Sequence, residues 1–218
     1  TRLGLHFLRG SQIGFDYLRR IQPPVAKVVD AVGISDDIRR DSPDTIVIGR
    51  LSGQDESLRA LDPAAAAETY LAGHLETYRL NPNVDYWEGW NEYVPTSTAD
   101  WNWYAAFEAR RACALKSLGL RAAIGSFSTG TPEFRDILLF LPALRAAAVC
   151  QAIFSLHEYS APTLQYGFGS PIPHRPPYPN RGMLLFRYRY WYEDILKPLD
   201  LAVPLVITEA GIDGGVGA

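Results

Sequence analysis

Residues 84–93 have the sequence VDYWEGWNEY, an apolar run that ends in polar side chains. Its β-branched and aromatic residues predict a β-strand from Val84 to Trp90, with Asn91 and Glu92 at the C-terminal end. Residues 206–211, VITEAG, follow the same plan and place Glu209 at the end of another apolar run. The two runs predict a sheet that brings two glutamates to one edge, and the remaining sequence indicates which kind of sheet it is.

Short apolar runs alternate with longer amphipathic or alanine-rich stretches along the chain, a pattern typical of repeated β-α units around a parallel sheet. Between the runs, Asp62-Pro63 is a helix start, and we expect that helix to continue to Leu80. Thr131-Pro132-Glu133 is expected to open another helix. The seven expected strands are Leu3 to Leu8, Val25 to Val29, Thr45 to Arg50, Val84 to Trp90, Arg121 to Phe127, Ala152 to Tyr159 and Pro204 to Glu209.

The first expected strand is not followed by a dinucleotide-binding loop, because residues 10–14 (GSQIG) do not match the G-x-G-x-x-G fingerprint. We therefore favour a TIM-type (β/α) barrel. Such barrels typically need eight units and about 250 residues, whereas this chain of 218 residues ends soon after its seventh expected strand. We expect residues 1–218 to form a single catalytic (β/α) barrel domain, truncated after strand 7 and lacking the eighth β-α unit.

Composition narrows the range of partners. A formal net charge of −3 leaves no broad basic surface to neutralise phosphates, so we expect no nucleic-acid partner. No apolar run reaches the roughly 18–20 residues of a membrane span. Cys113 and Cys150 have neither metal-ligand spacing nor a disulfide-rich pattern, so we expect two buried free thiols and no metal or cofactor. Oligomeric state and cellular location stay open at this stage.

The candidate site residues lie at the ends of the expected strands, where barrel enzymes carry their active sites. Successive side chains of a strand alternate between its two faces. Three sets of residues are therefore expected to point into the barrel mouth: His157 with Tyr159, Glu88 with Trp90 and Glu92, and Leu205 with Ile207 and Glu209. Glu88 lies deeper than a strand tip, and we expect it to be a buried structural residue paired with an arginine or histidine.

The motifs WEGWNE (87–92), HEY (157–159) and ITE (207–209), on the fourth, sixth and seventh expected strands, together resemble the large clan of retaining glycoside hydrolases built on the (β/α)₈ barrel. This resemblance implies that Glu92 is the general acid/base and Glu209 the nucleophile in the hydrolysis of β-glycosidic bonds. It implies an oligosaccharide or polysaccharide substrate. For a retaining mechanism, the two carboxyl groups should lie roughly 5–5.5 Å apart, and Glu209 should have a lowered pKa.

The same resemblance implies roles for neighbouring residues. Asn91 is expected to bind the sugar 2-hydroxyl and Tyr159 to bind the nucleophile, with His157 close by. Arg50 is a weaker match, because the clan commonly carries its arginine on the second strand and here it ends the third. Trp90 is expected near the substrate, since aromatic rings can cover the apolar C–H faces of sugars.

Two other functions remain open from the residues themselves. Glu92, His157, Glu209 and Asp213 could form an oxygen-rich metal site in a metal-dependent TIM-barrel isomerase or deacetylase. Alternatively, the chain could be a non-catalytic carbohydrate-binding barrel. In each case residues 160–181, which contain six prolines and follow the sixth strand, are expected to form a substrate-binding rim.

Overall fold

The computed structural model describes residues 3–212. Its strands form one parallel sheet in sequence order, with an α-helix in each crossover of the described part, and this confirms the predicted TIM-type α/β barrel. The seven strands of the described part agree with the seven expected. They are β1 (Leu5–Phe7), β2 (Val25–Val29), β3 (Ile46–Arg50), β4 (Tyr86–Glu88), β5 (Ala122–Phe127), β6 (Ile153–Ser160) and β7 (Leu205–Ile212). The expected lack of an eighth unit stays a prediction.

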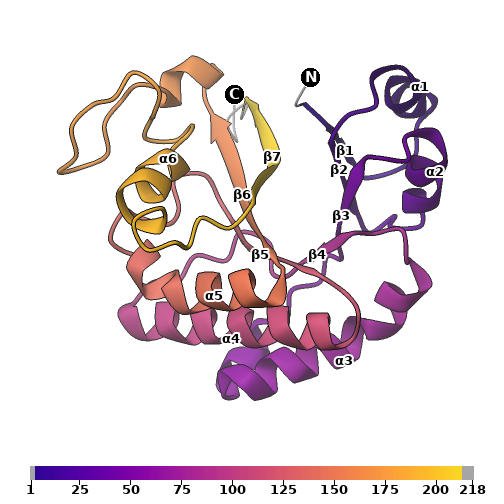
Figure 1. Ribbon diagram of the computed structural model, residues 1–218, viewed down its shortest axis with the longest axis horizontal. Helices are drawn as coiled ribbons and strands as arrows, with labels where there is room; N and C mark the ends of the chain where they lie inside the picture. The colour runs from indigo at the N-terminus through magenta and orange to yellow at the C-terminus, as the bar shows by residue number, and fades with distance from the viewer. Residues whose placement is uncertain (1–2, 213–218) are drawn as a thin grey trace.

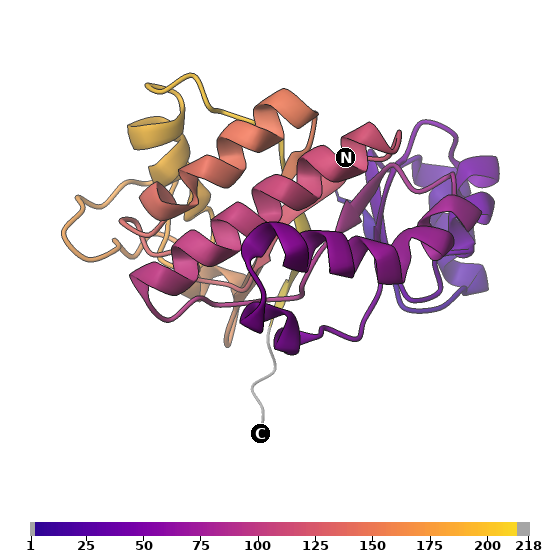
Figure 2. The ribbon, with the colours of Figure 1, turned by 90° about the horizontal axis from the view of Figure 1, so that it is seen from below.

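Helices cover the outer face of the sheet, and α3, α4 and α5 lie side by side across it (Figures 1 and 2). Asp62 caps α3 through hydrogen bonds to two backbone N–H groups, as its sequence predicts. The helices are α1 (Gln12–Ile21), α2 (Ile34–Asp41), α3 (Pro63–Leu80), α4 (Thr98–Ser117), α5 (Ile137–Cys150) and α6 (Tyr188–Trp191), with 3₁₀ turns η1 (Glu56–Ala60) and η2 (Leu164–Gly167) and the π-helical turn η3 (Tyr192–Leu196). Among residues 3–212, none of these helices combines the length and apolarity that crossing a membrane requires.

The sheet curves until its two edges approach each other. The edge strands β1 and β7 are not paired with one another in the described part, and Figure 1 shows them on opposite sides of the opening. Across the interior, however, Lys27 of β2 lies 2.7 Å from Glu209 of β7. The barrel is therefore nearly closed, and side chains from distant strands meet inside it.

Two apolar clusters divide the core. The larger one fills the space between the sheet and the helices, and the smaller one contains Ile48, Ala123 and Ile153. Ile48 pairs in register with Lys27, so the smaller cluster lies on the inner face of the barrel. Apolar residues thus fill the N-terminal part of the interior, and polar residues occupy its C-terminal part.

A buried ion pair fixes α4 to the sheet. Arg111 donates hydrogen bonds to Glu108 on its own helix and to the backbone oxygens of Trp87 and Ala123. Gly89 packs against this pair, because a Cβ added there would lie 2.8 Å from Glu108 Oε1. The glycine within the WEGWNE motif therefore allows close contact between the end of β4 and helix α4.

Two predictions at helices are wrong. Cys113 on α4 and Cys150 at the end of α5 form a disulfide, because the packing of the two helices brings their Cα atoms to 5.1 Å across 37 residues of sequence. Helix α5 begins at Ile137 rather than at residues 131–133. Glu133 instead forms an ion pair with Arg187, whose Nε also donates to the Pro132 oxygen, so this stretch connects to the segment before α6.

Candidate active site

Glu209 reaches the barrel interior through a β-bulge. The pairing of β6 with β7 shifts by one residue, so that Thr208 and Glu209 both face inward, and Thr208 Oγ1 lies 2.8 Å from Ser155 Oγ. The predicted common face of Leu205, Ile207 and Glu209 is therefore wrong. Leu205 and Ile207 pack outward on the larger apolar cluster.

The Glu209 carboxylate is surrounded by donors. Lys27 Nζ lies 2.7 Å from Oε1, Tyr159 Oη donates to Oε2 at 2.8 Å, and Arg50 Nη1 lies 3.4 Å away. Burial alone would favour the neutral acid, but the charge of Lys27 outweighs it, and the pKa of Glu209 is lowered to about 2. Burial and the hydrogen bond to Glu209 raise the pKa of Tyr159. Tyr159 is therefore a neutral donor to an ionised carboxylate.

Lys27 is the central residue that sequence reasoning missed. It is 2% exposed and also lies 2.7 Å from Glu88 Oε2 and 3.4 Å from His157 Nε2. The only signal in the sequence is a lysine within the apolar run VAKVV, because a lysine inside a buried strand needs a partner of opposite charge. It lies on the second strand, whereas the resemblance directed attention to Arg50 on the third.

Glu88 is the buried structural residue that its depth predicts. It is fully buried, and Ser155 Oγ donates to it at 2.5 Å. Burial opposes ionisation, but Lys27 lowers the pKa of Glu88 to about 2. Its cationic partner is a lysine from β2 rather than the expected arginine or histidine.

Glu92 lies in the segment after β4, not on the strand itself. Its backbone adopts a left-handed conformation (φ 52°), and its N–H donates to the Ser126 oxygen at 2.9 Å. This turn directs the carboxylate back to the barrel axis, where Oε1 lies 2.8 Å from His157 Nδ1. The side chain is 37% exposed, so the group faces the open end of the barrel.

His157 lies between the two glutamates. Its side chain is fully buried, with Nδ1 at Glu92 and Nε2 3.6 Å from Glu209 Oε1. One ligand atom from each of Glu92, His157 and Glu209 lies within 4.8 Å of the others. Such a cluster could hold a divalent ion, but Lys27 already supplies a cation to Glu209. The fourth predicted ligand, Asp213, lies outside the described residues.

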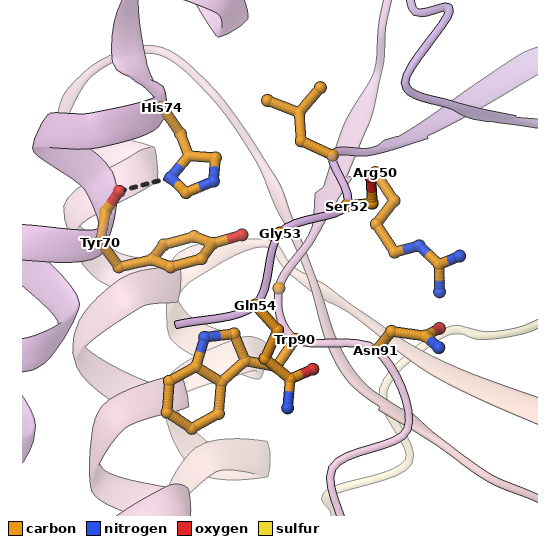
Figure 3. A pocket seen from close by; sticks show the side chains of 10 residues that line it. Arg50, Ser52, Gly53, Gln54, Tyr70, His74, Trp90 and Asn91 are labelled. Carbon is orange, nitrogen blue, oxygen red and sulfur yellow. Dashed lines mark hydrogen bonds between the residues drawn. The ribbon is translucent and has the colours of Figure 1, made fainter. Parts of the chain in front are cut away.

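The remaining predicted residues lie beside this centre. Arg50 and Asn91 line a cavity of about 110 Å³ (Figure 3), and Arg50 Nη1 also lies 3.4 Å from Glu209 Oε1. Trp90 is 1% exposed and stacks on Phe107 of α4 at 5.0 Å. The prediction that Trp90 shares a face with Glu88 and Glu92 is wrong, because β4 ends at Glu88 and the alternation ends with it.

The proline-rich segment 160–181 projects from the end of β6 beside α6 (Figure 1). It contains the turn η2, and Tyr166 is 63% exposed. Its role as a substrate-binding rim stays a prediction.

No family model and no curated protein matches the chain. Among solved structures, the fold is similar to a family 39 glycoside hydrolase from the gut symbiont Bacteroides cellulosilyticus WH2, with a TM-score of 0.59, 14% identity, and coverage of 96% of this chain and 49% of that one. It is also similar to the endo-β-1,4-mannanase from Thermotoga petrophila, with a TM-score of 0.51, 12% identity, and coverage of 96% and 60%. The chain thus spans about half to three-fifths of the length of these proteins, and at this identity the likeness shows the shared barrel fold.

Proposed function

We propose that the chain is a glycoside hydrolase that cleaves β-glycosidic bonds with retention of configuration, with Glu209 as nucleophile and Glu92 as general acid/base. One observation carries this proposal. One oxygen of Glu209 on β7 and one of Glu92 in the segment after β4 lie within 4.8 Å of each other, and Glu209 is held ionised by Lys27 and Tyr159. So close an approach of two oxygens favours the roughly 5–5.5 Å carboxyl separation of retaining enzymes over the 6.5–9.5 Å of inverting ones.

The reaction takes place in two balanced steps. A Glu209 oxygen bonds to the anomeric carbon, the glycosidic C–O bond breaks, and the Glu92 proton passes to the departing oxygen. Water then attacks the same carbon, gives its proton to Glu92, and releases Glu209. Two inversions restore the original configuration. His157, in contact with both glutamates, orients them toward a common point.

The similar structures support the same proposal. One is named as a family 39 glycoside hydrolase and the other as an endo-β-1,4-mannanase. An oligosaccharide or polysaccharide with β-linkages is therefore the substrate class to test first. Asn91, at the open end beside Glu92, is exposed and available to a sugar hydroxyl.

The test is turnover of a panel of β-linked manno-, xylo-, gluco- and galacto-oligosaccharides. Glu209→Ala should abolish turnover of the oligosaccharide that the chain hydrolyses. Glu92→Ala should slow hydrolysis by about 10²- to 10⁴-fold, the usual contribution of general acid catalysis, but much less for a dinitrophenyl glycoside, whose leaving group needs no proton. Equal losses for both leaving groups would contradict the role of Glu92.

A metal-dependent reaction is the second candidate, because the Glu92, His157 and Glu209 cluster has suitable ligand types. Lys27 argues against it, since its ammonium lies 2.7 Å from Glu209 and would repel a divalent ion there. We expect turnover to be unchanged after dialysis against EDTA. Loss of activity that added metal restores would favour this candidate, and sugar binding without turnover would indicate a non-catalytic barrel.

A further inference from the structure

The two ring nitrogens of His157 have neighbours of different kinds. Nδ1 lies 2.8 Å from Glu92 Oε1. Nε2 lies 3.4 Å from Lys27 Nζ and 3.6 Å from Glu209 Oε1. A neutral imidazole carries one proton, and the hydrogen bonds of the ring decide which nitrogen holds it. The contacts of His157 therefore decide where this proton lies in the site.

Lys27 determines the state of Nε2. An ammonium group has three N–H donors and no acceptor, so its hydrogen bond to His157 requires an unprotonated Nε2. A proton on Nε2 would lie beside the ammonium, and Glu209 Oε1 at 3.6 Å is too distant to accept it. The side chains of Lys27 and His157 are 2% and 0% exposed, so water does not replace these contacts. The neutral ring therefore holds its proton on Nδ1.

Two ion pairs hold Lys27 in this position. Its Nζ lies 2.7 Å from Glu88 Oε2 and 2.7 Å from Glu209 Oε1. These carboxylates belong to β4 and β7, so the ammonium is fixed from two sides of the barrel interior. The donor beside Nε2 is thus part of the structure before any substrate binds.

The tautomer of His157 affects Glu92 through Nδ1. A protonated Nδ1 donates to Glu92 Oε1, and this leaves Glu92 Oε2 to carry the catalytic proton. With the opposite tautomer, Nδ1 would accept, and the protonated Glu92 carboxyl would donate to it instead of to the substrate. We propose that Lys27 is a positioning residue for the general acid: it fixes the Nδ1–H tautomer of His157, so that Glu92 delivers its proton to the glycosidic oxygen from Oε2.

This inference deepens the proposed function and rests on it for the role of Glu92. The tautomer of His157 follows from its own contacts with Lys27 and Glu92. It can therefore be measured on the chain without any substrate.

The first test determines the tautomer. The chain has four histidines, and two- and three-bond ¹H–¹⁵N correlation spectra distinguish protonated from unprotonated ring nitrogens. His157→Asn identifies the His157 signals by their loss. At pH 8 we expect a protonated Nδ1 and an unprotonated Nε2. His74 is an internal reference, because its Nδ1 lies 2.6 Å from the Tyr70 backbone oxygen, which can only accept. A His157 ring that carries a proton on Nε2 overturns the proposal.

The second test examines the cause. The Lys27→Met/Glu88→Gln variant removes the ammonium together with one of the carboxylates that face it. Nε2 then has no cation beside it and keeps Glu209 as a neighbour. We expect His157 to change to the Nε2–H form while His74 keeps its Nδ1 proton. An unchanged His157 tautomer in the folded variant overturns the role of Lys27, and the spectrum of the unmodified chain decides the tautomer in either case.

The third test measures the consequence for Glu92. It compares kcat/KM for the oligosaccharide that the chain hydrolyses and for the matching dinitrophenyl glycoside, whose leaving group needs no proton. Lys27→Met/Glu88→Gln should slow both reactions, because Glu209 loses its cation. It should slow the oligosaccharide reaction at least about tenfold more, a part of the roughly 10²- to 10⁴-fold that general acid catalysis contributes.

Tyr159→Phe is the matched control for the kinetic test. It removes the hydrogen bond to Glu209 Oε2 and leaves the contact between Lys27 and His157 in place. It should therefore slow both substrates by the same factor. If Tyr159→Phe and the Lys27 variant change the ratio of the two rates equally, Lys27 acts only through Glu209, and the proposal is overturned.

The tests separate the two proposals. If the chain hydrolyses no oligosaccharide, the proposed function fails, while the tautomer spectra still decide whether Lys27 fixes His157. If hydrolysis occurs and His157 carries its proton on Nε2, the positioning role of Lys27 is wrong and the hydrolase proposal stands.

Discussion

At the scale of single residues, Lys27 organises the site. Its ammonium lies 2.7 Å from both Glu88 and Glu209, and it is almost completely buried. A buried cation between the fully buried Glu88 and the partly buried Glu209 lowers the pKa of both carboxyl groups, whereas burial alone would raise it. The ionisation of Glu209, the proposed nucleophile on β7, thus depends on Lys27 of β2, a strand that is not paired with β7.

Lys27→Met should destabilise the chain by about 3–5 kcal/mol, since it leaves the buried Glu88 carboxylate without its counter-ion. The double variant Lys27→Met/Glu88→Gln should recover part of this loss, because it removes one uncompensated charge as well. Urea unfolding of both variants measures the difference. Equal midpoints for Lys27→Met and the unmodified chain would show that the ion pair does not contribute to stability.

The same substitution should change the pH dependence of activity. Glu209 has a folded pKa of about 2, below its ordinary value of 4.5, so its stabilising interactions are complete above pH 4.5 and are lost as the pH falls toward 2. Removing the Lys27 charge raises the pKa of Glu209. We therefore expect the acid limb of kcat/KM to move to higher pH in the Lys27→Met/Glu88→Gln variant, and an unmoved limb would contradict the role of Lys27.

At the scale of the elements, the sequence predicted which strands carry the site residues but not the direction in which each side chain points. All seven strand positions follow from apolar runs bounded by turn residues, and the ends of β4, β6 and β7 carry the predicted polar residues. The bulge at Thr208 and the left-handed turn at Glu92 leave no periodic signal. Both depend on contacts with neighbouring strands, so simple alternation assigned the wrong face to Trp90.

Strand β6 also carries a buried acid on the outer side of the barrel. Glu158 accepts a hydrogen bond from the Phe186 N–H at 2.9 Å, and burial raises its pKa to about 7. Because the folded pKa exceeds the ordinary 4.5, folding becomes less favourable as the pH rises from 4.5 to 7, and the loss is constant above that range.

Glu158→Gln should therefore raise the free energy of unfolding at pH 8 by about 2–3 kcal/mol, with no gain below pH 4.5. Chemical unfolding at both pH values measures this, and Glu76→Gln on the exposed face of α3 is the control. A gain that is equal at both pH values would rule out the titration of Glu158 as its cause.

The disulfide between α4 and α5 also leads to a testable prediction. The sequence around its two cysteines did not indicate that they pair. Cys113→Ser or Cys150→Ser should lower the free energy of unfolding by about 2–4 kcal/mol, because the cross-link restricts the unfolded chain. Thiol titration of the unfolded, unreduced chain should find no free cysteine, in agreement with the pairing of the only two cysteines present. Two reactive thiols would contradict it.

At the scale of the whole molecule, the barrel brings together residues from strands far apart in sequence. Lys27, Glu92, His157 and Glu209 come from β2, the segment after β4, β6 and β7, and they meet because the parallel sheet is nearly closed. The sequence predicted the repeated units and the common edge of the strands. It could not predict the ion pair across the interior, since that contact depends on the curvature of the sheet.

The central claim is that Glu209 attacks the anomeric carbon. The most direct measurement is the configuration of that carbon in the first product, together with the residue to which the sugar is attached in the intermediate. With the oligosaccharide that the chain hydrolyses, ¹H NMR of the first product should show the β-anomer before mutarotation. A 2-deoxy-2-fluoro analogue should leave a covalent sugar on Glu209, detected by peptide mass spectrometry. An α-anomer as the first product, or a sugar attached to another residue, would contradict the account.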